Sequence, residues 1–256
     1  MLKNKINPFR SRAFSKYLSV SLIAIFIILI FLGLIWMSGG RQSGIPDEID
    51  FIQLKTPDDN APVVVFETNL GRVKAVLFPE DAPNYCEYFI NLVNSGYYDN
   101  TYFCAVVQNA YALGGTKSPN PNEAETPESD LTAIEAETSK RLWPLKGSLV
   151  SFVGTKGIWP FETNLAGSTF LFINTLGEQY MNESALVRAY GEALGKAYAE
   201  KGGIPNFSKK YTVFGQIYSG LDTFEAILAT EALESAQPAT DIIIEKAYIS
   251  TYGEEN

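Results

Sequence analysis

The spacing of hydrophobic and polar positions changes several times along the chain. Residues 17–40 form one continuous uncharged run, centred on SLIAIFIILIFLGLIWM. From residue 63 onward the apolar residues alternate with polar ones or form short runs, which is typical of β-strands. Three stretches instead place apolar residues three or four positions apart, which favours amphipathic helices. The pattern therefore predicts a long apolar segment followed by a domain of short strands with a few helices.

The predicted strands are short and are separated by turn-forming residues. Val63–Glu67 and Arg72–Leu77 flank the sequence TNLG, a combination that indicates a β-hairpin. Further strands are expected in Thr101–Gly115, which runs into a glycine turn, in Gly147–Gly154, in Gly167–Asn174, in YTVFGQIYSG from Tyr211 and in Thr240–Thr251. No alternation of strand, helix and strand is present, so the fold class is antiparallel β, either a barrel or a sandwich.

Three amphipathic helices are expected. The first begins near Pro83 and ends before Gly96, with apolar residues at helical spacing between them. The second lies between Asn182 and Gly202 and places Leu186, Tyr190, Leu194 and Ala197 on one face, which we expect to pack against the same domain. The third runs from Leu221 to about Thr230.

The apolar run has the length and flanking charges of a membrane anchor. Its 24 uncharged residues, Tyr17 to Gly40, are long enough as a helix to cross a hydrocarbon core of roughly 30 Å. Five Lys and Arg residues and no acid occupy residues 1–16, which predicts a cytoplasmic N-terminus and an extracytoplasmic C-terminal part. The alternative is a cleaved signal peptide, whose apolar region is normally about 7–15 residues long and ends in an A-x-A-like site. The sequence MSGGRQSG lacks that site, so we predict an uncleaved single-pass anchor in the cell membrane.

These boundaries define the predicted organisation of the chain. Residues 1–16 are a basic cytoplasmic segment, 17–40 cross the lipid bilayer and 41–61 form a tether rich in turn-formers and acids. Residues 62–252 form the folded domain, with insertions at about 117–146 and 182–209. Within the first insertion, the acidic and Pro-rich stretch Ser118–Lys140 is predicted to be a solvated loop with room for one helical turn.

Composition excludes several kinds of chemistry. The chain has no histidine and only two cysteines, so a His-based zinc site, a CxxC centre and a histidine general base are excluded, and no metal or cofactor is predicted. Residues 41–256 hold 15 Lys and Arg against 29 Asp and Glu, a net charge of −14, which argues against nucleic-acid binding. Cys86 and Cys104 either pair as a disulfide or are two small buried hydrophobic residues; their spacing leaves both alternatives open.

Taken in order, the sequence blocks resemble the cyclophilin-type peptidyl-prolyl isomerase domain. The resemblance rests on FETNLGRVKAVLFPEDAPNYCEYFINLVNSGYYDNTYF, the double glycine Gly114–Gly115, GSTFLFI and YTVFGQIYSGLDTFEAI, followed by a last strand, and it covers roughly residues 62–252. It implies a mainly β fold, namely a closed eight-stranded antiparallel barrel capped by two helices. It also implies an outer groove that binds X-Pro segments and speeds rotation about the X-Pro bond.

The resemblance places the family's catalytic arginine at a position where this chain has none. Phe103 matches the Phe of the family's FHR triplet, so Cys104 stands at the His and Ala105 at the catalytic Arg. A guanidinium suits this reaction because it stays charged and presents a fork of donors near the proline nitrogen. No catalytic residue is therefore assigned.

Other groove positions are substituted as well. By the resemblance, Ala110 replaces a pocket Phe, Tyr111 the pocket Met, and Leu113 and Thr169 two Gln residues. Leu171 replaces a second Phe, Tyr211 takes the place of a His, and Tyr180 stands near the pocket aromatic residue. The predicted substrate-binding groove consists of Tyr111, Leu113, Thr169, Leu171, Tyr180 and Tyr211. The alternative is that these side chains only pack a surface that has lost its groove.

The sequence thus predicts a membrane-anchored extracytoplasmic domain that binds proline-containing segments of exported proteins in a folding or chaperone role. Loss of one transition-state donor typically costs about 2.7–4 kcal/mol, so isomerase activity is expected to be weak or lost. One alternative is an active isomerase whose cation comes from elsewhere, with Arg72, Lys74, Lys117 and Lys156 as candidates. The other is a non-catalytic interaction module that uses the acidic loop 118–140 and the helix near Leu186–Tyr198.

Overall fold

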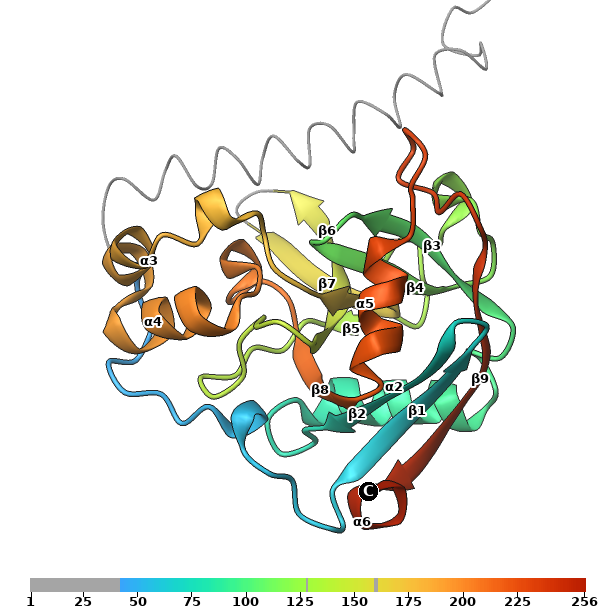
Figure 1. The fold of residues 1–256 in the computed structure, drawn as a ribbon, viewed down its shortest axis with the longest axis horizontal. Helices are drawn as coiled ribbons and strands as arrows, with labels where there is room; N and C mark the ends of the chain where they lie inside the picture. Colours follow the sequence, from blue (N-terminus) through green and yellow to red (C-terminus); the bar gives the residue numbers. More distant parts are fainter. Residues whose placement is uncertain (1–41, 128, 159–160) are drawn as a thin grey trace, which may run out of the picture.

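The computed structural model describes residues 42–127, 129–158 and 161–256 (Figure 1). β-Strands are the main regular structure of the described chain, and the helices lie at the periphery. The strands are β1 Pro62–Thr68, β2 Gly71–Leu77, β3 Thr101–Val107, β4 Tyr111–Thr116, β5 Ile134–Glu135, β6 Ser148–Ile158, β7 Phe161–Ile173, β8 Val213–Ser219 and β9 Ile242–Thr251. The α-helices are α2 Pro83–Asn94, α3 Glu183–Tyr190, α4 Glu192–Lys201, α5 Leu221–Ala229 and α6 Tyr252–Glu255. The 3-10 turns are η3 Ile52–Leu54, η4 Pro121–Glu123, η5 Glu178–Tyr180 and η6 Pro205–Phe207.

Eight strands close into an antiparallel barrel. Their order is β4-β3-β9-β1-β2-β8-β6-β7, and the pairing of β7 with β4 completes the ring. The two-residue strand β5 is added to the outer edge of β7. Closure leaves the eight main strands paired on both sides over their barrel portions, which removes exposed sheet edges there. The predicted eight-stranded barrel is confirmed.

Aromatic rings fill the barrel interior. Phe66, Phe103, Phe170 and Phe172 contact one another, with ring centroids 4.9–6.0 Å apart. Such pairs add to the free energy of burying the rings. The rings come from β1, β3 and β7, so segments far apart in sequence meet in one core.

Two helices cover the barrel, as the resemblance implied. Phe89 of α2 lies 6.4 Å from the Phe66 ring, and Phe224 of α5 lies 6.1 Å from the Phe172 ring. Pro83 begins α2, where a missing backbone N–H costs nothing. The carboxylate of Glu137, from the insertion 117–146, accepts hydrogen bonds from the backbone N–H groups of Asn84 and Tyr85 at 3.3 and 2.8 Å. This supplies the helix start with the negative charge that its dipole favours.

The single helix predicted between Asn182 and Gly202 is instead two. α3 ends and α4 begins at Gly191, whose φ of +83° is accessible mainly to glycine. The two helices then fold back on each other so closely that a Cβ at Gly195 would lie 2.4 Å from the Val187 backbone nitrogen. The helical spacing of apolar residues continues across this turn, and for that reason the pattern alone predicted one helix.

The apolar faces of α3 and α4 pack against the same domain, as predicted. Leu186, Tyr190, Leu194 and Tyr198 are buried in a second core together with Ile45 and Trp143. This core lies beside the barrel, on the left in Figure 1. The helices are therefore an integral part of the fold.

Residues 42–61, predicted to be a tether, follow the surface of the domain. Ile45 is buried between the two helices and Trp143. Gln53 is also buried: its Nε2 donates to the Trp143 carbonyl at 2.9 Å, and its Oε1 accepts from the Trp143 N–H at 2.7 Å. Turn-forming residues and acids indicated a free linker, but these two side chains attach the segment. The description of this segment as a free tether is therefore wrong for the described residues.

The predicted cytoplasmic segment 1–16 and the predicted anchor 17–40 lie outside the described residues. Within residues 42–256, apart from the three positions omitted above, no helix is both long and apolar enough to cross a bilayer. The membrane anchor therefore stays a prediction.

The stretch Ser118–Lys140, predicted to be a solvated loop, is partly attached to the barrel. Asp130 Oδ2 accepts hydrogen bonds from the Ser168 N–H and the Tyr88 hydroxyl, each at 3.1 Å. Ile134 and Glu135 then pair with β7 as β5. Hydrogen bonds to a charged carboxylate are strong, so these bonds hold the loop on the surface of the barrel. The acidic composition indicated a polar stretch. It did not indicate the contacts that Asp130 and β5 make with the rest of the domain.

Candidate functional site

Three of the predicted positions lie side by side across β3, β4 and β7. Ala105 pairs with Leu113, and Leu113 pairs with Leu171. Directly opposed residues of paired strands place their side chains on the same face. Since Phe170 and Phe172 point into the barrel, Leu171 between them points outward. The position of the missing arginine is thus next to two leucines on the outer face.

Aromatic side chains cover this outer face. The ring centroids of Tyr111 and Phe207 lie 6.0 Å apart, and those of Phe207 and Tyr211 lie 4.2 Å apart in a stacked arrangement. We call Tyr111, Phe207 and Tyr211 the aromatic cluster. Their exposed fractions are 9%, 2% and 4%, and Leu171 is 1% exposed. The face on which the family holds a proline ring is therefore filled by the chain's own side chains.

Phe207 was not among the predicted site residues. It lies in η6, at the end of the insertion 182–209, which brings it against Tyr111 and Tyr211. Its position four residues before Tyr211 was a usable signal, because η6 and the following turn bring such residues close together. The insertion has no counterpart in the family pattern, so the resemblance did not point to this ring and only the four-residue spacing from Tyr211 could have done so.

The hydroxyl and thiol groups of this face are uncharged near neutral pH, and burial raises their pKa values further. It raises the pKa of Tyr211 to about 12 and that of Tyr111 well above its usual range. The Cys104 thiol, at the family's His position, is buried and its pKa is raised to about 11. These three residues and Ala105 can therefore offer apolar and aromatic contact, and none of them supplies a cation.

Thr169 is buried in β7 without a hydrogen-bond partner for its hydroxyl among the described residues. Its exposed fraction is only 2%, and a buried unpaired hydroxyl costs about 1–3 kcal/mol. The resemblance placed Thr169 at a Gln that binds substrate backbone. A threonine hydroxyl at this position is shorter than a Gln amide and carries one donor.

Tyr180 lies apart from the row formed by β3, β4 and β7. It ends η5, which follows β7 and precedes α3, and its backbone N–H donates to the Gly177 carbonyl at 2.9 Å. The ring contacts of the aromatic cluster join Tyr111 and Tyr211 through Phe207. Tyr180, the residue predicted near the pocket aromatic position, therefore lies on η5, outside the strands that form this face.

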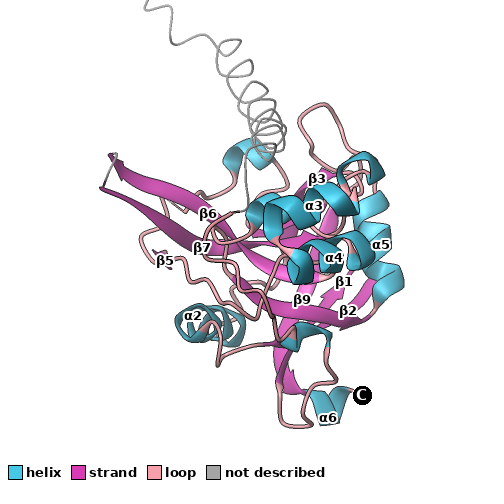
Figure 2. Cartoon of the chain, turned by 90° about the vertical axis from the view of Figure 1, so that its left-hand side faces the viewer, coloured by secondary structure: helices cyan, strands magenta, loops and turns pink. Residues whose placement is uncertain are grey.

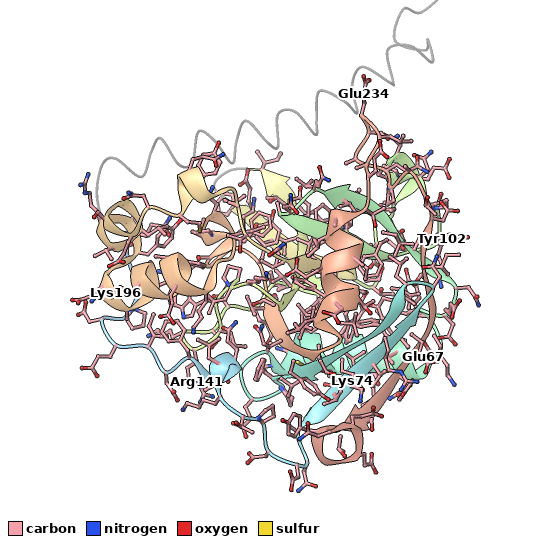
Figure 3. All side chains as sticks on the ribbon, viewed as in Figure 1. Glu67, Lys74, Tyr102, Arg141, Lys196 and Glu234 are labelled. Atoms are coloured by element: carbon pink, nitrogen blue, oxygen red, sulfur yellow. The ribbon has the colours of Figure 1, made fainter. Side chains whose placement is uncertain are left out.

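The four candidate cations lie on other parts of the molecule. Two of them form ion pairs: Arg72 with Glu67 at 2.7 Å and Lys74 with Glu255 at 2.8 Å. The Lys117 Nζ atom lies 4.1 Å from the centroid of the Tyr97 ring. Lys156 lies on β6, opposite Thr163 of β7. Figure 3 shows Glu67 and Lys74 on the lower part of the barrel. A fifth cation is closer to the aromatic cluster: Lys210 Nζ lies 5.8 Å from the centroid of the Tyr211 ring.

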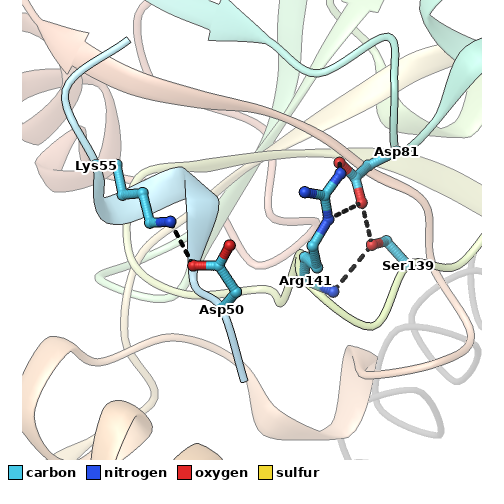
Figure 4. A network of polar contacts seen from close by, with 5 residues as sticks. All are labelled: Asp50, Lys55, Asp81, Ser139 and Arg141. Carbon is cyan, nitrogen blue, oxygen red and sulfur yellow. Dashed lines mark hydrogen bonds and ion pairs between the residues drawn. The ribbon is translucent and has the colours of Figure 1, made fainter. Parts of the chain in front are cut away.

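A cavity of about 710 Å³ lies elsewhere, between residues 52–62, residues 76–81 and Arg141. Arg141 closes one side of it through two hydrogen bonds to Asp81, at 3.1 and 2.6 Å (Figure 4). The same carboxylate accepts from the Ser139 hydroxyl at 2.6 Å. This network fixes the end of the insertion 117–146 to the β2–α2 connection. The cavity is lined by β1, β2 and the segment before them, so it is separate from the predicted groove.

Cys86 and Cys104 are free thiols, and both are buried. Cys86 lies on α2, where its thiol donates to the Phe214 carbonyl at 3.6 Å, and Cys104 lies on β3. The second alternative raised by the sequence, two small buried hydrophobic residues, describes them.

Comparison with known proteins agrees with the fold and the matched blocks. The family model "Cyclophilin type peptidyl-prolyl cis-trans isomerase/CLD" matches residues 63–249. A protein of Staphylococcus epidermidis, named "Putative peptidyl-prolyl cis-trans isomerase", is 31% identical over 193 residues, which is 75% of this chain and 93% of that protein. A protein of the same name from Staphylococcus aureus is 33% identical over 184 residues, 71% of this chain and 88% of that protein.

One relative is much longer than this chain. It is a Streptococcus pyogenes protein named "Putative bifunctional phosphatase/peptidyl-prolyl cis-trans isomerase", 28% identical over 203 residues. The match covers 78% of this chain and 41% of that protein, so the chain spans less than half of this relative.

Among solved structures, a cyclophilin type peptidyl-prolyl cis-trans isomerase of Cryptosporidium parvum has a TM-score of 0.55 at 22% identity, covering 75% of this chain and 98% of that one. The same protein has been crystallised in the presence of the dipeptide Ala-Pro, and that structure has a TM-score of 0.54. These likenesses support the fold, and the sequence matches support the family. The chain belongs to the cyclophilin-type peptidyl-prolyl cis-trans isomerase family.

Proposed function

We propose that this chain is a membrane-anchored, extracytoplasmic cyclophilin-family domain that binds proline-containing segments of exported proteins and has weak or no isomerase activity. Residues 17–40 act as the anchor, and the outer face of β3, β4 and β7 is the binding surface. The role is that of a holding or folding factor for chains that emerge on the far side of the membrane.

The row Ala105, Leu113 and Leu171 carries this proposal. The pairing registers place these residues next to one another, so the arginine and one of the glutamine positions are replaced by apolar side chains on one surface. Catalysis of X-Pro rotation needs a fixed donor or cation at the proline nitrogen, and an apolar row cannot supply it. It can still contribute apolar contact to a proline ring.

The aromatic cluster supports binding under one condition. Tyrosine rings stack readily on proline, and Tyr111 and Tyr211 both contact Phe207 in the aromatic cluster. Because these rings now fill the face, a peptide has to displace at least one of them. The proposal therefore implies weak binding that includes the cost of moving a buried ring.

The first experiment tests the prediction of weak or absent isomerase activity. It measures prolyl isomerisation by the full chain in detergent, with an assay that uses no protease. We expect a kcat/KM at least about 100-fold below that of a cyclophilin that carries the arginine, the effect of losing one transition-state donor. A rate within tenfold of that cyclophilin would contradict the proposal.

Lys210 favours one specific alternative, an active isomerase with a relocated cation. Its ammonium is 5.8 Å from the Tyr211 ring, so it is the described cation that borders the aromatic cluster. The variant Lys210→Met separates the two functions. If Lys210 acts in catalysis, the rate falls by at least tenfold in this variant; under our proposal the low rate stays unchanged. Lys209→Met, the neighbouring position, is the matched control.

Peptide titration followed by methyl NMR tests the binding half. We expect a proline-containing peptide to shift the methyl signals of Leu113 and Leu171, and the same peptide with Ala in place of Pro to shift them less. Shifts confined to α3 and α4 would favour the interaction module instead. The interaction module was predicted to use the helix near Leu186–Tyr198 as a contact surface. Leu186 and Tyr198 are buried in the second core, so these two side chains are not available to a partner.

A further inference from the structure

The strands β6 and β7 continue beyond the barrel as a two-stranded ribbon. β8 pairs with β6 only as far as Val150, and β4 pairs with β7 only from Phe170 onward. The two strands nevertheless stay paired with each other from Val153 and Ala166 out to Ile158 and Phe161. We call residues 153–158 and 161–166 the β6–β7 arm. Figure 2 shows it projecting from the body of the domain.

The described end of the arm is apolar and exposed. Ile158 and Phe161 pair directly and are 82% and 85% exposed. Burying such a side chain is worth about 1.5–3 kcal/mol, which the domain alone does not gain here. Lys156 and Glu162 flank the pair with one charge of each sign. Paired large apolar side chains at the end of a projecting element indicate a contact surface rather than scattered exposure.

A second projection, a loop that carries Leu233 between the exposed acids Glu231 and Glu234, lies on the same side of the molecule. The connection between α5 and β9 is a tight loop, closed by a hydrogen bond from Leu233 N to the Gln237 carbonyl at 2.8 Å. Leu233 in this loop is 55% exposed. Figure 1 places the arm end and this loop at the top of the domain, and Figure 3 labels Glu234 in the loop.

The chain enters the described domain on this side as well. The Gln42 N–H donates to the Ala189 carbonyl of α3 at 2.7 Å, and α3 lies in the upper half of Figures 1 and 2. The uncharged run ends at Gly40, one residue before Arg41. Gln42 is two residues after that run, and two residues of extended chain span at most roughly 7 Å. A bilayer that holds residues 17–40 therefore lies close to the domain.

We propose that the end of the β6–β7 arm, with Ile158 and Phe161, inserts together with Leu233 into the headgroup–acyl boundary of the bilayer that holds the anchor. The inference rests on the anchor of the proposed function and adds a second attachment point. Apolar side chains on a projecting element bind this boundary without spanning it. Because the arm end has balanced charge and residues 41–256 are acidic, the contact does not require anionic lipid.

Two attachment points fix how the domain is oriented. An anchor alone lets the domain rotate about its link, whereas an inserted arm removes that freedom. Eight residues separate Phe161 from Thr169 along β7, about 26 Å of extended strand. The arm can therefore place up to this length of strand between the lipid and the outer face of β3, β4 and β7, where an emerging polypeptide can reach it.

Site-specific fluorescence on the full chain in neutral phosphatidylcholine vesicles tests this proposal. The variant Phe161→Cys receives an environment-sensitive probe, and Glu67→Cys, on the lower part of the barrel in Figure 3, is the matched control. Cys86 and Cys104 are buried and do not compete for the label. With acyl-chain quencher lipids we expect the probe at 161 to lose at least about half its emission, and the probe at 67 to be unaffected.

Flotation of the vesicles separates the anchor from the arm. If the chain floats with the vesicles but the probe at 161 is not quenched, the arm proposal is wrong while the anchor stands. If the chain does not float, the anchor fails and the arm proposal fails with it. A change at 161 that appears without lipid and grows with added unlabelled chain would identify a second copy as the partner and overturn the lipid proposal. A probe can also be attached to the variant Leu233→Cys. Because the arm end and Leu233 are proposed to insert together, adding Ile158→Ser should weaken the quenching of this probe.

Discussion

The two faces of strand β7 differ in which residues of the family pattern they keep. Phe170 and Phe172 point inward and contact Phe66 and Phe103 in the barrel core. Thr169 and Leu171 alternate with them and point outward, where the resemblance placed a peptide groove. The inner face keeps the residues that build the barrel. The outer face keeps its position in the fold but has lost the polar residues of an isomerase site.

This difference shows that scaffold and chemistry are separable on a single strand. The inner residues must fill a closed space, so their size and shape are constrained by packing. The outer residues are constrained only by what binds there. In this chain the aromatic cluster has filled that space, so the outer face now resembles a second, smaller core.

The largest expected effect tests whether both faces are packed. Phe170→Ala should lower the free energy of unfolding by about 3–5 kcal/mol and Leu171→Ala by about 2 kcal/mol or more, because each leaves a cavity. Denaturant titration measures both, with the exposed Ile158→Ala as control, expected to change stability by less than about 0.5 kcal/mol. If Leu171→Ala behaves like the control, the outer face is an open groove.

The next effect concerns the ring that covers the outer face. The pKa of Tyr211 is about 12 in the folded protein and near 10 when unfolded, so the unfolded chain loses this proton first. Stability should therefore fall between pH 10 and 12, and Tyr211 should account for about 1.4 kcal/mol per pH unit of that fall. Tyr211→Phe should reduce the slope by this amount and leave the slope from pH 7 to 9 unchanged. Equal slopes above pH 10 would mean that the ring is solvated.

The smallest effect tests the unpaired hydroxyl on the outer side of β7. Thr169→Val removes that hydroxyl and should raise the free energy of unfolding by about 1 kcal/mol. Thr212→Val is the matched control and should lower it, since the Thr212 hydroxyl accepts a hydrogen bond from the Glu137 N–H at 2.8 Å. A loss of stability in both variants would show that Thr169 has a partner.

Much of the barrel follows from local sequence. The hairpin of β1 and β2, the helix after Pro83 and the last strand each have their own spacing and turn residues, and the structure has them at nearly the predicted residues. The substitution at Ala105 was also visible, because matched residues on both sides fix its position. Local patterns are readable in this way when each element contains its own start, stop and periodicity.

Other features depended on contacts between distant residues. Gln53 bonds to Trp143, 90 positions away, and this contact attaches a segment that composition described as a free tether. The strands of the β6–β7 arm also extend beyond the predicted strands, since their outer parts are held by pairing with each other and, near the barrel, with β5. Composition reports average preference and contains no information about which partner a side chain will meet.

By itself, the sequence determined an antiparallel β domain with its main helices, and the family resemblance of its blocks predicted the closed barrel and the absence of the family's arginine at residue 105. Only the tertiary structure decided that Phe207, Tyr111 and Tyr211 fill the outer face, that the second helix breaks at Gly191, and that the β6–β7 arm exposes Ile158 and Phe161. The physical reason is the range of the interactions. Strand and helix periodicity acts over a few residues, whereas burial of a ring or exposure of an arm is set by which surfaces the whole fold brings together.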